Sequence, residues 1–187
     1  MSWKLADRVI DVSLGNEPTT SMPEAPADGS IYNISDEVSI TLLTRASEHL
    51  GKSTITLCRD TSNQEIEGKY NLRGLCIWAS VEAKSYLEAC GYKPAVLLIP
   101  RVQESGSDDH YFVVITTGKK DTSTIVDLTW TQFNGSDKST LPYWLAGTVK
   151  QLEQRVKGVL PKSNRKNLVG AWKAGIDIVK NIGKSCG

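Results

Sequence analysis

Apolar residues recur at helical spacing in two stretches of the first half of the chain. The first stretch, 35–50, starts with Ser35 and two acidic residues and is followed by Gly51. Serine favours a helix start, acidic side chains stabilise the first turn, and glycine is common just beyond the last turn. Residues 35–50 are therefore predicted to form a helix. His49 lies in its last turn, where a cation interacts favourably with the helix dipole, so we interpret it as structural.

The second stretch, 75–89, has a wider apolar face. This face is formed by Leu75, Trp78, Ala79, Ala83, Tyr86, Leu87 and Cys90. A face of this width is typical of a helix buried in the middle of a fold. Gly91 follows at the place where a left-handed residue commonly ends a helix. The pattern predicts a buried helix over 75–89.

Four short runs of apolar and β-branched residues have the length of strands. They are 54–58, 95–100, 111–116 and 124–129. Short polar turns separate the last three runs. Because short turns join neighbouring antiparallel strands, the middle of the chain is predicted to be one helix followed by an antiparallel meander.

The remaining segments predict loops and flanking helices. Residues 59–74 are polar and rich in turn formers, which indicates an exposed loop. Two helices, 142–160 and 164–182, are predicted on either side of Pro161.

These elements predict an α+β fold with flanking N- and C-terminal helices. Residues 1–29 are expected to form an arm or linker, because a short helix over 2–14 leads into a proline-rich loop. Residues 30–187 then form a single domain, in which 142–187 is a C-terminal helical extension.

Composition and charge restrict the classes of protein. The 187 residues are 40% hydrophobic and 23% charged, as in globular proteins, and the formal net charge of +1 gives no overall attraction to nucleic acid. No apolar run has transmembrane length and no signal peptide is evident, so a soluble chain made in the cytosol is expected. The segment 150–184 nevertheless holds nine Lys and Arg against Glu153 and Asp177. That surface is either a solvated face or a docking site for an acidic partner or an anionic membrane.

The cysteines do not follow a metal-binding or redox pattern. Cys58, Cys76, Cys90 and Cys186 form no CxxC pair, and the chain has only two histidines. Neither a zinc knuckle nor a thioredoxin-like site is expected, and no metal or other cofactor is predicted. A domain of this size does not need disulfides, so free thiols are favoured.

Cys76, His110 and Asp127 have the sequence contexts of a thiol nucleophile, its base and an orienting group. Cys76 starts a predicted helix, His110 opens a strand, and Asp127 lies late in the next strand. A helix N-terminus and a nearby imidazolium both favour the reactive thiolate. His110 would transfer the proton, while Asp127 would fix its tautomer. Each residue alone is more often structural, so the prediction depends on their order and context.

Further residues could complete such a site. The backbone N–H of Cys76 and an upstream side chain would bind the oxyanion of the reaction. The candidates for this side chain are Asn71, Tyr70 and Gln64. A substrate cleft could be walled by Trp78, Trp130 and Trp144, for which packing in the core is the alternative.

A spaced set of motifs connects these residues. It reads Gly74-x-Cys76-x-x-x-Ser80, Gly91-x-x-Pro94-Ala95, His110 before a β-run, and Val126-Asp127-x-Thr129-x-x-Gln132-Phe133. The set spans 70–133, about a third of the chain, and resembles the core of the papain-like and transglutaminase-like cysteine hydrolases. The resemblance implies a catalytic helix packed on an antiparallel sheet. It also implies Cys76 as nucleophile, His110 as general acid and base, and Asp127 as orienter.

The superfamily includes peptidases, transglutaminases, protein-glutamine deamidases, arylamine acetyltransferases and compact bacterial effectors or toxins. Acetyltransferases carry Arg-Gly-Gly-x-Cys, whereas Leu75 directly follows Gly74 here, so acetyl transfer is discounted. The shared step is thiolate attack on a carboxamide or peptide carbonyl to give a thioester. Water then makes the enzyme a deamidase or peptidase, and an amine makes it a transglutaminase.

The resulting expectation is a cysteine-dependent hydrolase of a protein substrate. It resembles bacterial effector or toxin deamidases and peptidases, which a specialised secretion system could deliver into the cytosol of a target cell. Two alternatives remain open. One is a transglutaminase-type acyl transferase, and the other is a non-catalytic protein-binding module with a coincidental triad.

Overall fold

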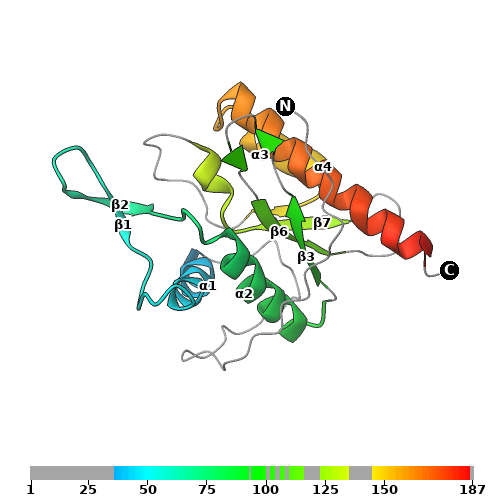
Figure 1. The fold of residues 1–187 in the computed structure, drawn as a ribbon, viewed down its shortest axis with the longest axis horizontal. Coiled ribbons are helices and arrows are strands. Elements are labelled where there is room, and N and C mark those ends of the chain that lie inside the picture. The colour runs from blue at the N-terminus through cyan, green and yellow to red at the C-terminus, as the bar shows by residue number, and fades with distance from the viewer. Residues whose placement is uncertain are drawn as a thin grey trace.

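A four-stranded antiparallel sheet lies at the centre of the fold (Figure 1). The computed structural model describes residues 36–92, 94–99, 102–103, 106–107, 110–115, 123–134 and 145–185. The sheet contains, in hydrogen-bonded order, β3 (Pro94–Ile99), β6 (His110–Ile115), β7 (Thr124–Asp127) and β8 (Leu145–Gly147). Each neighbouring pair is antiparallel, so the meander predicted for the first three strands is confirmed. The described residues therefore have an α+β fold.

The strand β8 shows that the helix predicted over 142–160 is wrong in its first part. Helix α3 spans only Val149–Val156, because a capping box starts it at Thr148. The Thr148 backbone N–H donates to the Gln151 side chain at 2.9 Å, and the Gln151 backbone N–H donates to the Thr148 hydroxyl at 3.4 Å. A Cβ at Gly147 would lie 3.2 Å from the side chains of Gln151 and Leu152, so a residue without a side chain suits this turn. These capping signals, rather than apolar spacing, set the boundary between strand and helix.

The exposed loop predicted over 59–74 is also wrong in part, because it contains a strand. Strands β1 (Leu57–Arg59) and β2 (Glu65–Tyr70) form an antiparallel hairpin. Its turn is held by the Asp60 carboxylate, which accepts hydrogen bonds from the backbone N–H groups of Ser62 and Gln64, both at 2.9 Å. Local turn chemistry thus folds a polar stretch into a hairpin. A smaller hairpin, β4 (Val102–Gln103) with β5 (Gly106–Ser107), occupies the turn predicted between the later strands.

The helices predicted over 35–50, 75–89 and 164–182 are confirmed. Helix α1 spans Asp36–Glu48, α2 spans Cys76–Ala89, and α4 spans Lys162–Ser185. Gly91 follows α2 with φ of +84°, the left-handed conformation that the sequence predicted there. A short 3-10 helix, η2 (Trp130–Asn134), follows β7.

Helices cover both faces of the sheet (Figure 1). One apolar cluster joins α1 and α2 to the residues Val113, Ile115 and Val126 of the central strands. A second cluster joins α3 and α4 to the alternate residues Phe112, Val114 and Ile125. Because successive residues of a strand face opposite sides, β6 and β7 are buried on both sides. The predicted N-terminal arm, 1–29, and its short helix lie outside the described residues. In the part of the chain that the structure describes, no helix combines the length and apolarity required to cross a membrane.

A buried charge network fixes α1 against α2. The Arg45 guanidinium donates to the Glu82 carboxylate at 2.8 Å, and their side chains are 2% and 1% exposed. His49, one residue beyond α1, contacts the other oxygen of Glu82 at 2.9 Å and stacks on Trp78 with ring centroids 4.4 Å apart. These contacts explain His49 without a catalytic role.

We expect Glu82→Ala to lower the free energy of unfolding by about 3–5 kcal/mol, because it removes the carboxylate that faces a buried guanidinium. The measurement is urea unfolding followed by circular dichroism. Glu88→Ala is the matched control on the same helix, since the Glu88–Lys84 pair is exposed and its loss should cost less than about 1 kcal/mol. Equal effects of the two substitutions would contradict the importance of the buried network.

Candidate active site

His110 and Asp127 meet at one end of the sheet, because β6 begins where the antiparallel strand β7 ends. The Nε2 atom of His110 lies 2.7 Å from Oδ2 of Asp127. Their side chains are 1% and 0% exposed. A short bond between two buried groups that can carry opposite charges is among the strong hydrogen bonds of proteins.

The Asp127 carboxylate accepts two further hydrogen bonds. The backbone N–H of Thr129 donates to Oδ1 at 3.0 Å. The indole N–H of Trp172, from helix α4, donates to Oδ2 at 3.0 Å. A buried carboxylate is costly unless its oxygens are paired, and these donors, together with His110, satisfy both oxygens. The carboxylate is therefore held in one orientation.

Cys76 approaches the imidazole from helix α2, which covers the face of the sheet opposite to α4. It is the first residue of α2 and is 8% exposed. Its side chain lies close enough to His110 to help raise the pKa of the imidazole. Because Asp127 occupies Nε2, the ring nitrogen left for the thiol is Nδ1. Cys76, His110 and Asp127, predicted from separate elements, are thus brought together in the order of a nucleophile, a base and an orienter.

The start of α2 is also suited to meet negative charge. Leu75, the residue before the helix, supplies no side-chain cap. The first N–H groups of a helix have no partner within the helix and lie at the positive end of its dipole. The N–H groups beside Cys76 can therefore stabilise an oxyanion that develops at a carbonyl bound to the thiol.

The pKa of His110 is raised to about 9. Burial acts in the opposite direction, because it penalises the charged ring. The charge and hydrogen bond of Asp127, together with the Cys76 side chain, outweigh burial. His110 is therefore an imidazolium at neutral pH. Beside a thiol, an imidazolium favours the thiolate and holds a proton ready for a leaving group.

Two residues of η2 contact the imidazole and were part of the motif without an assigned role. The Gln132 side-chain nitrogen lies 3.2 Å from Nδ1 of His110, and the Phe133 ring meets the imidazole edge-on with centroids 4.8 Å apart. The Gln132 side chain is exposed, whereas His110 is buried. Gln132 therefore lies beside Nδ1. When this nitrogen carries a proton, the amide can bond to it only through its oxygen.

The three candidate oxyanion side chains lie on or just after the β1–β2 hairpin. Gln64 is exposed in its turn. Tyr70 ends β2 and packs against the cluster formed by α1 and α2. Asn71 is exposed, and its side-chain oxygen accepts a hydrogen bond from the Arg73 backbone N–H at 3.1 Å. Gln64 and Asn71 thus take part in local turns, and the oxyanion role of all three stays a prediction.

The candidate cleft tryptophans are placed in different parts of the fold. Trp130 is 2% exposed and belongs to the cluster formed by the sheet with α3 and α4. Trp78 is half-buried and stacks on His49. Core packing and the helix contact account for these two side chains, and Trp144 lies outside the described residues.

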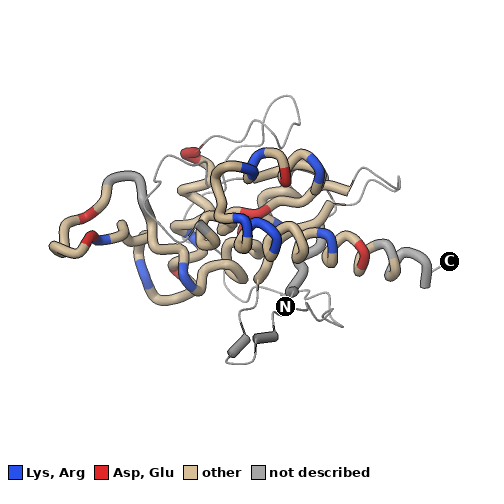
Figure 2. Tube along the Cα trace, turned by 90° about the horizontal axis from the view of Figure 1, so that it is seen from above, with Lys and Arg blue, Asp and Glu red and all other residues tan. Residues whose placement is uncertain are grey.

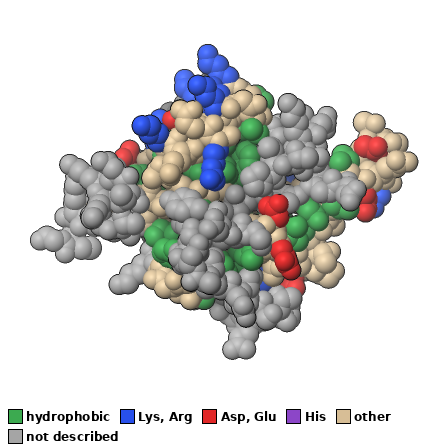
Figure 3. Space-filling view, turned by 180° about the vertical axis from the view of Figure 1, so that it is seen from behind, with side chains coloured by type: hydrophobic (Ala, Val, Ile, Leu, Met, Phe, Trp, Pro, Cys, Tyr) green, Lys and Arg blue, Asp and Glu red, His purple; other side chains and the backbone are tan. Residues whose placement is uncertain are grey.

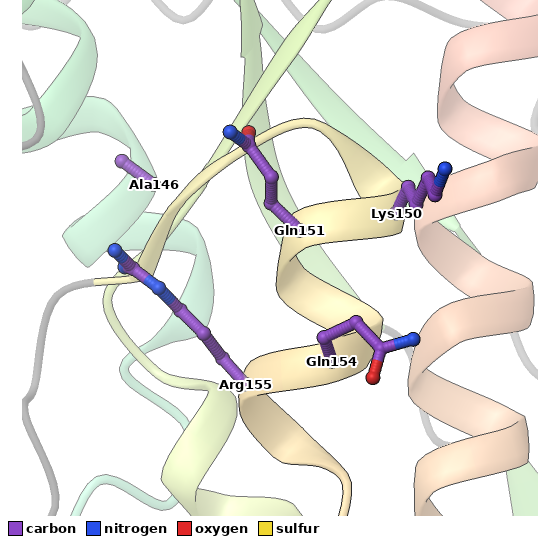
Figure 4. Close-up of a pocket in the computed structure, with 5 residues that line it drawn as sticks. All are labelled: Ala146, Lys150, Gln151, Gln154 and Arg155. Carbon is purple, nitrogen blue, oxygen red and sulfur yellow. The ribbon is translucent and has the colours of Figure 1, made fainter.

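A basic surface covers the outer side of α3 and α4. Figure 2 shows the positions of Lys and Arg along the C-terminal helix, and Figure 3 shows Lys and Arg side chains gathered at one edge of the molecule. A groove of about 520 Å³ on α3 is lined by Ala146, Lys150, Gln151, Gln154 and Arg155 (Figure 4). The apolar side of α4 is packed in the core. Binding of an acidic partner or an anionic membrane there stays a prediction.

No protein-family model, curated protein or solved structure matches the chain. The chemistry of the site is therefore argued from the contacts of its own residues.

The raised pKa of His110 makes the stability of the fold depend on pH. A group whose pKa is raised by folding contributes stability that is fully present below its unfolded value, about 6.5, and is lost as the pH rises through its folded value. With a folded pKa of about 9, this stability should disappear between roughly pH 6.5 and 9. The loss is of the order of 3 kcal/mol.

The measurement is urea unfolding at several pH values in this range. His110→Gln removes the titrating ring, so its free energy of unfolding should fall less over the same range than that of the unmodified protein. His49→Gln keeps His110 and should show the full decrease. The same pH dependence in His110→Gln as in the unmodified chain would contradict the assignment.

Proposed function

We propose that the protein is a cysteine-dependent hydrolase that attacks a carboxamide or peptide bond of a protein substrate. Cys76 is the nucleophile, His110 the general acid and base, and Asp127 the group that orients His110. The observation that carries the proposal is the buried His110–Asp127 hydrogen bond of 2.7 Å beside a cysteine at a helix start. A packed core needs none of these polar groups, and burying them without a function is costly.

The first half of the reaction forms a thioester. The Cys76 thiolate attacks the carbonyl carbon, and the negative charge moves to the carbonyl oxygen, where N–H groups at the start of α2 stabilise it. When the tetrahedral intermediate collapses, the C–N bond breaks and the imidazolium of His110 gives its proton to the departing nitrogen. Ammonia leaves from a glutamine side chain, and an amine leaves from a peptide bond.

The second half restores the enzyme. His110, now neutral, takes a proton from water while the water oxygen attacks the thioester carbonyl. The carboxylic acid product leaves, and the sulfur returns to the thiolate–imidazolium pair. If an amine replaces water, the same steps yield a cross-linked or modified glutamine. The acyl acceptor therefore decides between hydrolysis and transglutaminase-type transfer.

The arrangement of elements supports a papain-like or transglutaminase-like core as the finer description of the fold. The helix that starts with Cys76 packs on an antiparallel sheet, and two successive paired strands of that sheet carry His110 and Asp127. An effector or toxin type of enzyme, delivered into a target cell, follows from the sequence resemblance alone. Deamidation and proteolysis fit this type better than transfer does.

We expect Cys76 to be alkylated by iodoacetamide at neutral pH faster than the other cysteines. The imidazolium favours its thiolate, whereas burial raises the pKa of the Cys90 thiol and so disfavours the reactive form of that residue. Peptide mass spectrometry measures the rates at each cysteine. His110→Ala should slow the labelling of Cys76 by about tenfold or more, and His49→Ala should leave it unchanged. Labelling of Cys76 no faster than of Cys58 or Cys90 would favour a non-catalytic binding module.

The reaction itself is identified by incubating candidate target proteins with the enzyme and with Cys76→Ala. A gain of about one dalton on glutamine means deamidation, a cleaved backbone means proteolysis, and a cross-link means transfer. We expect deamidation or cleavage with the unmodified enzyme and neither with Cys76→Ala. A fully active Cys76→Ala protein would refute the proposed nucleophile.

A further inference from the structure

We propose that Trp172 is a positioning residue for the His110–Asp127 pair, so that the C-terminal helix α4 is a working part of the active site. The inference rests on the proposed function. Trp172 lies 45 residues beyond Asp127 in the sequence and on the opposite layer of the fold from Cys76. It is fully buried, and its link to the proposed catalytic residues is the hydrogen bond to Asp127, so we expect its effect on the chemistry to pass through Asp127.

The hydrogen bonds of Asp127 carry the argument. The indole N–H of Trp172 and the Nε2 atom of His110 bond to the same oxygen, Oδ2, at 3.0 and 2.7 Å. A carboxylate oxygen has two lone pairs, so these two groups occupy both directions. Because the indole N–H occupies one lone-pair direction of Oδ2, the imidazole is confined to the second direction. The indole therefore sets the angle at which the ring meets Asp127 and the direction in which Nδ1 points.

The remaining hydrogen bond of Asp127, from Thr129, does not by itself fix the direction of the imidazole. The Thr129 backbone N–H bonds to Oδ1, the other oxygen, from a residue only two positions away. That bond fixes one oxygen only, so rotation about the Cβ–Cγ bond of Asp127 is opposed more strongly when a second donor holds Oδ2. Trp172 supplies the second fixed point from a different element. Two fixed points on the carboxylate hold the imidazole in place for attack geometry, where small displacements reduce rates strongly.

Packing accounts for the indole ring but not for the target of its N–H group. Trp172 is fully buried in the cluster with Leu168 and Ile176 of the same helix. An apolar side chain of similar size would fill that volume, whereas a buried indole N–H requires an acceptor. The acceptor here is the atom that orients the proposed general base. This choice of partner distinguishes a positioning residue from a core residue.

Trp172→Phe tests the inference because it keeps an aromatic ring in the cluster and removes the N–H donor. We expect the rate of Cys76 alkylation at neutral pH to fall by about tenfold to a hundredfold. The pH profile of alkylation should also shift, since it reports the state of the His110–Asp127 pair. Ile176→Val is the matched control, because it loosens the same cluster from the same helix and leaves the indole in place. It should keep the rate and the profile of the unmodified protein, whatever either substitution does to stability.

A wild-type rate and profile in Trp172→Phe would overturn the inference, as would equal changes in Trp172→Phe and Ile176→Val. If Cys76 of the unmodified protein reacts no faster than Cys58 and Cys90, the proposed function fails and the inference fails with it. Failure of the inference is thus seen in Trp172→Phe, whereas failure of the proposed function is seen in the unmodified protein.

A second measurement serves if Trp172→Phe does not fold. In the unmodified protein, the NMR resonance of the Trp172 indole N–H should change with pH at the midpoint of the Cys76 alkylation profile. Both signals report the same carboxylate and imidazole. An indole resonance that is insensitive to pH across that midpoint would overturn the inference.

Discussion

The hydrogen bond between His110 and Asp127 is the interaction on which the rest of the site depends. It joins the start of β6 to the end of β7, and each partner has a further contact in one of the two helical layers. His110 contacts Cys76 of α2, and Asp127 contacts Trp172 of α4. The pair therefore connects both helical layers through the sheet. A site assembled in this way requires α2, α4 and the two central strands together.

Burial gives this pair its chemical character and also constrains it. Removing His110 from water would by itself keep the ring neutral, yet the nearby carboxylate raises the pKa to about 9. The carboxylate can stay buried only because donors from Thr129, Trp172 and His110 satisfy its oxygens. The same contacts that make the pair tolerable in the core thus make His110 a cation beside Cys76. The contacts that stabilise the buried His110–Asp127 pair are therefore the same contacts that would make it reactive in the proposed function.

The sequence predicted the parts of this arrangement that depend on local pattern. Helix α2 and the strands β6 and β7 follow from apolar spacing, and the places of Cys76, His110 and Asp127 within them led to the prediction that these side chains lie together. Their catalytic roles stay a prediction. The errors have local causes as well: a capping box at Thr148 converts a predicted helix into strand and helix, and the Asp60 turn creates the β1–β2 hairpin. Trp172 could not be recognised, because a tryptophan on the apolar face of a helix has the pattern of a core residue. Its role appears only when the acceptor of its N–H group is known.

The position of Gln132 bears on which acyl acceptor, water or an amine, would resolve the thioester of the proposed reaction. Cys76 and His110 are buried, and of the described residues that contact the imidazole, Gln132 has the exposed side chain. Its amide lies at Nδ1, the atom that in the proposed mechanism gives a proton to the leaving nitrogen and then takes one from the acceptor. A substrate carboxamide or a water molecule that reaches Nδ1 must therefore share or displace the place of this amide. If the proposed reaction takes place, we therefore expect the choice between water and an amine to be made beside η2, on the side of the imidazole away from Asp127, since Cys76, His110 and Asp127 serve either acceptor.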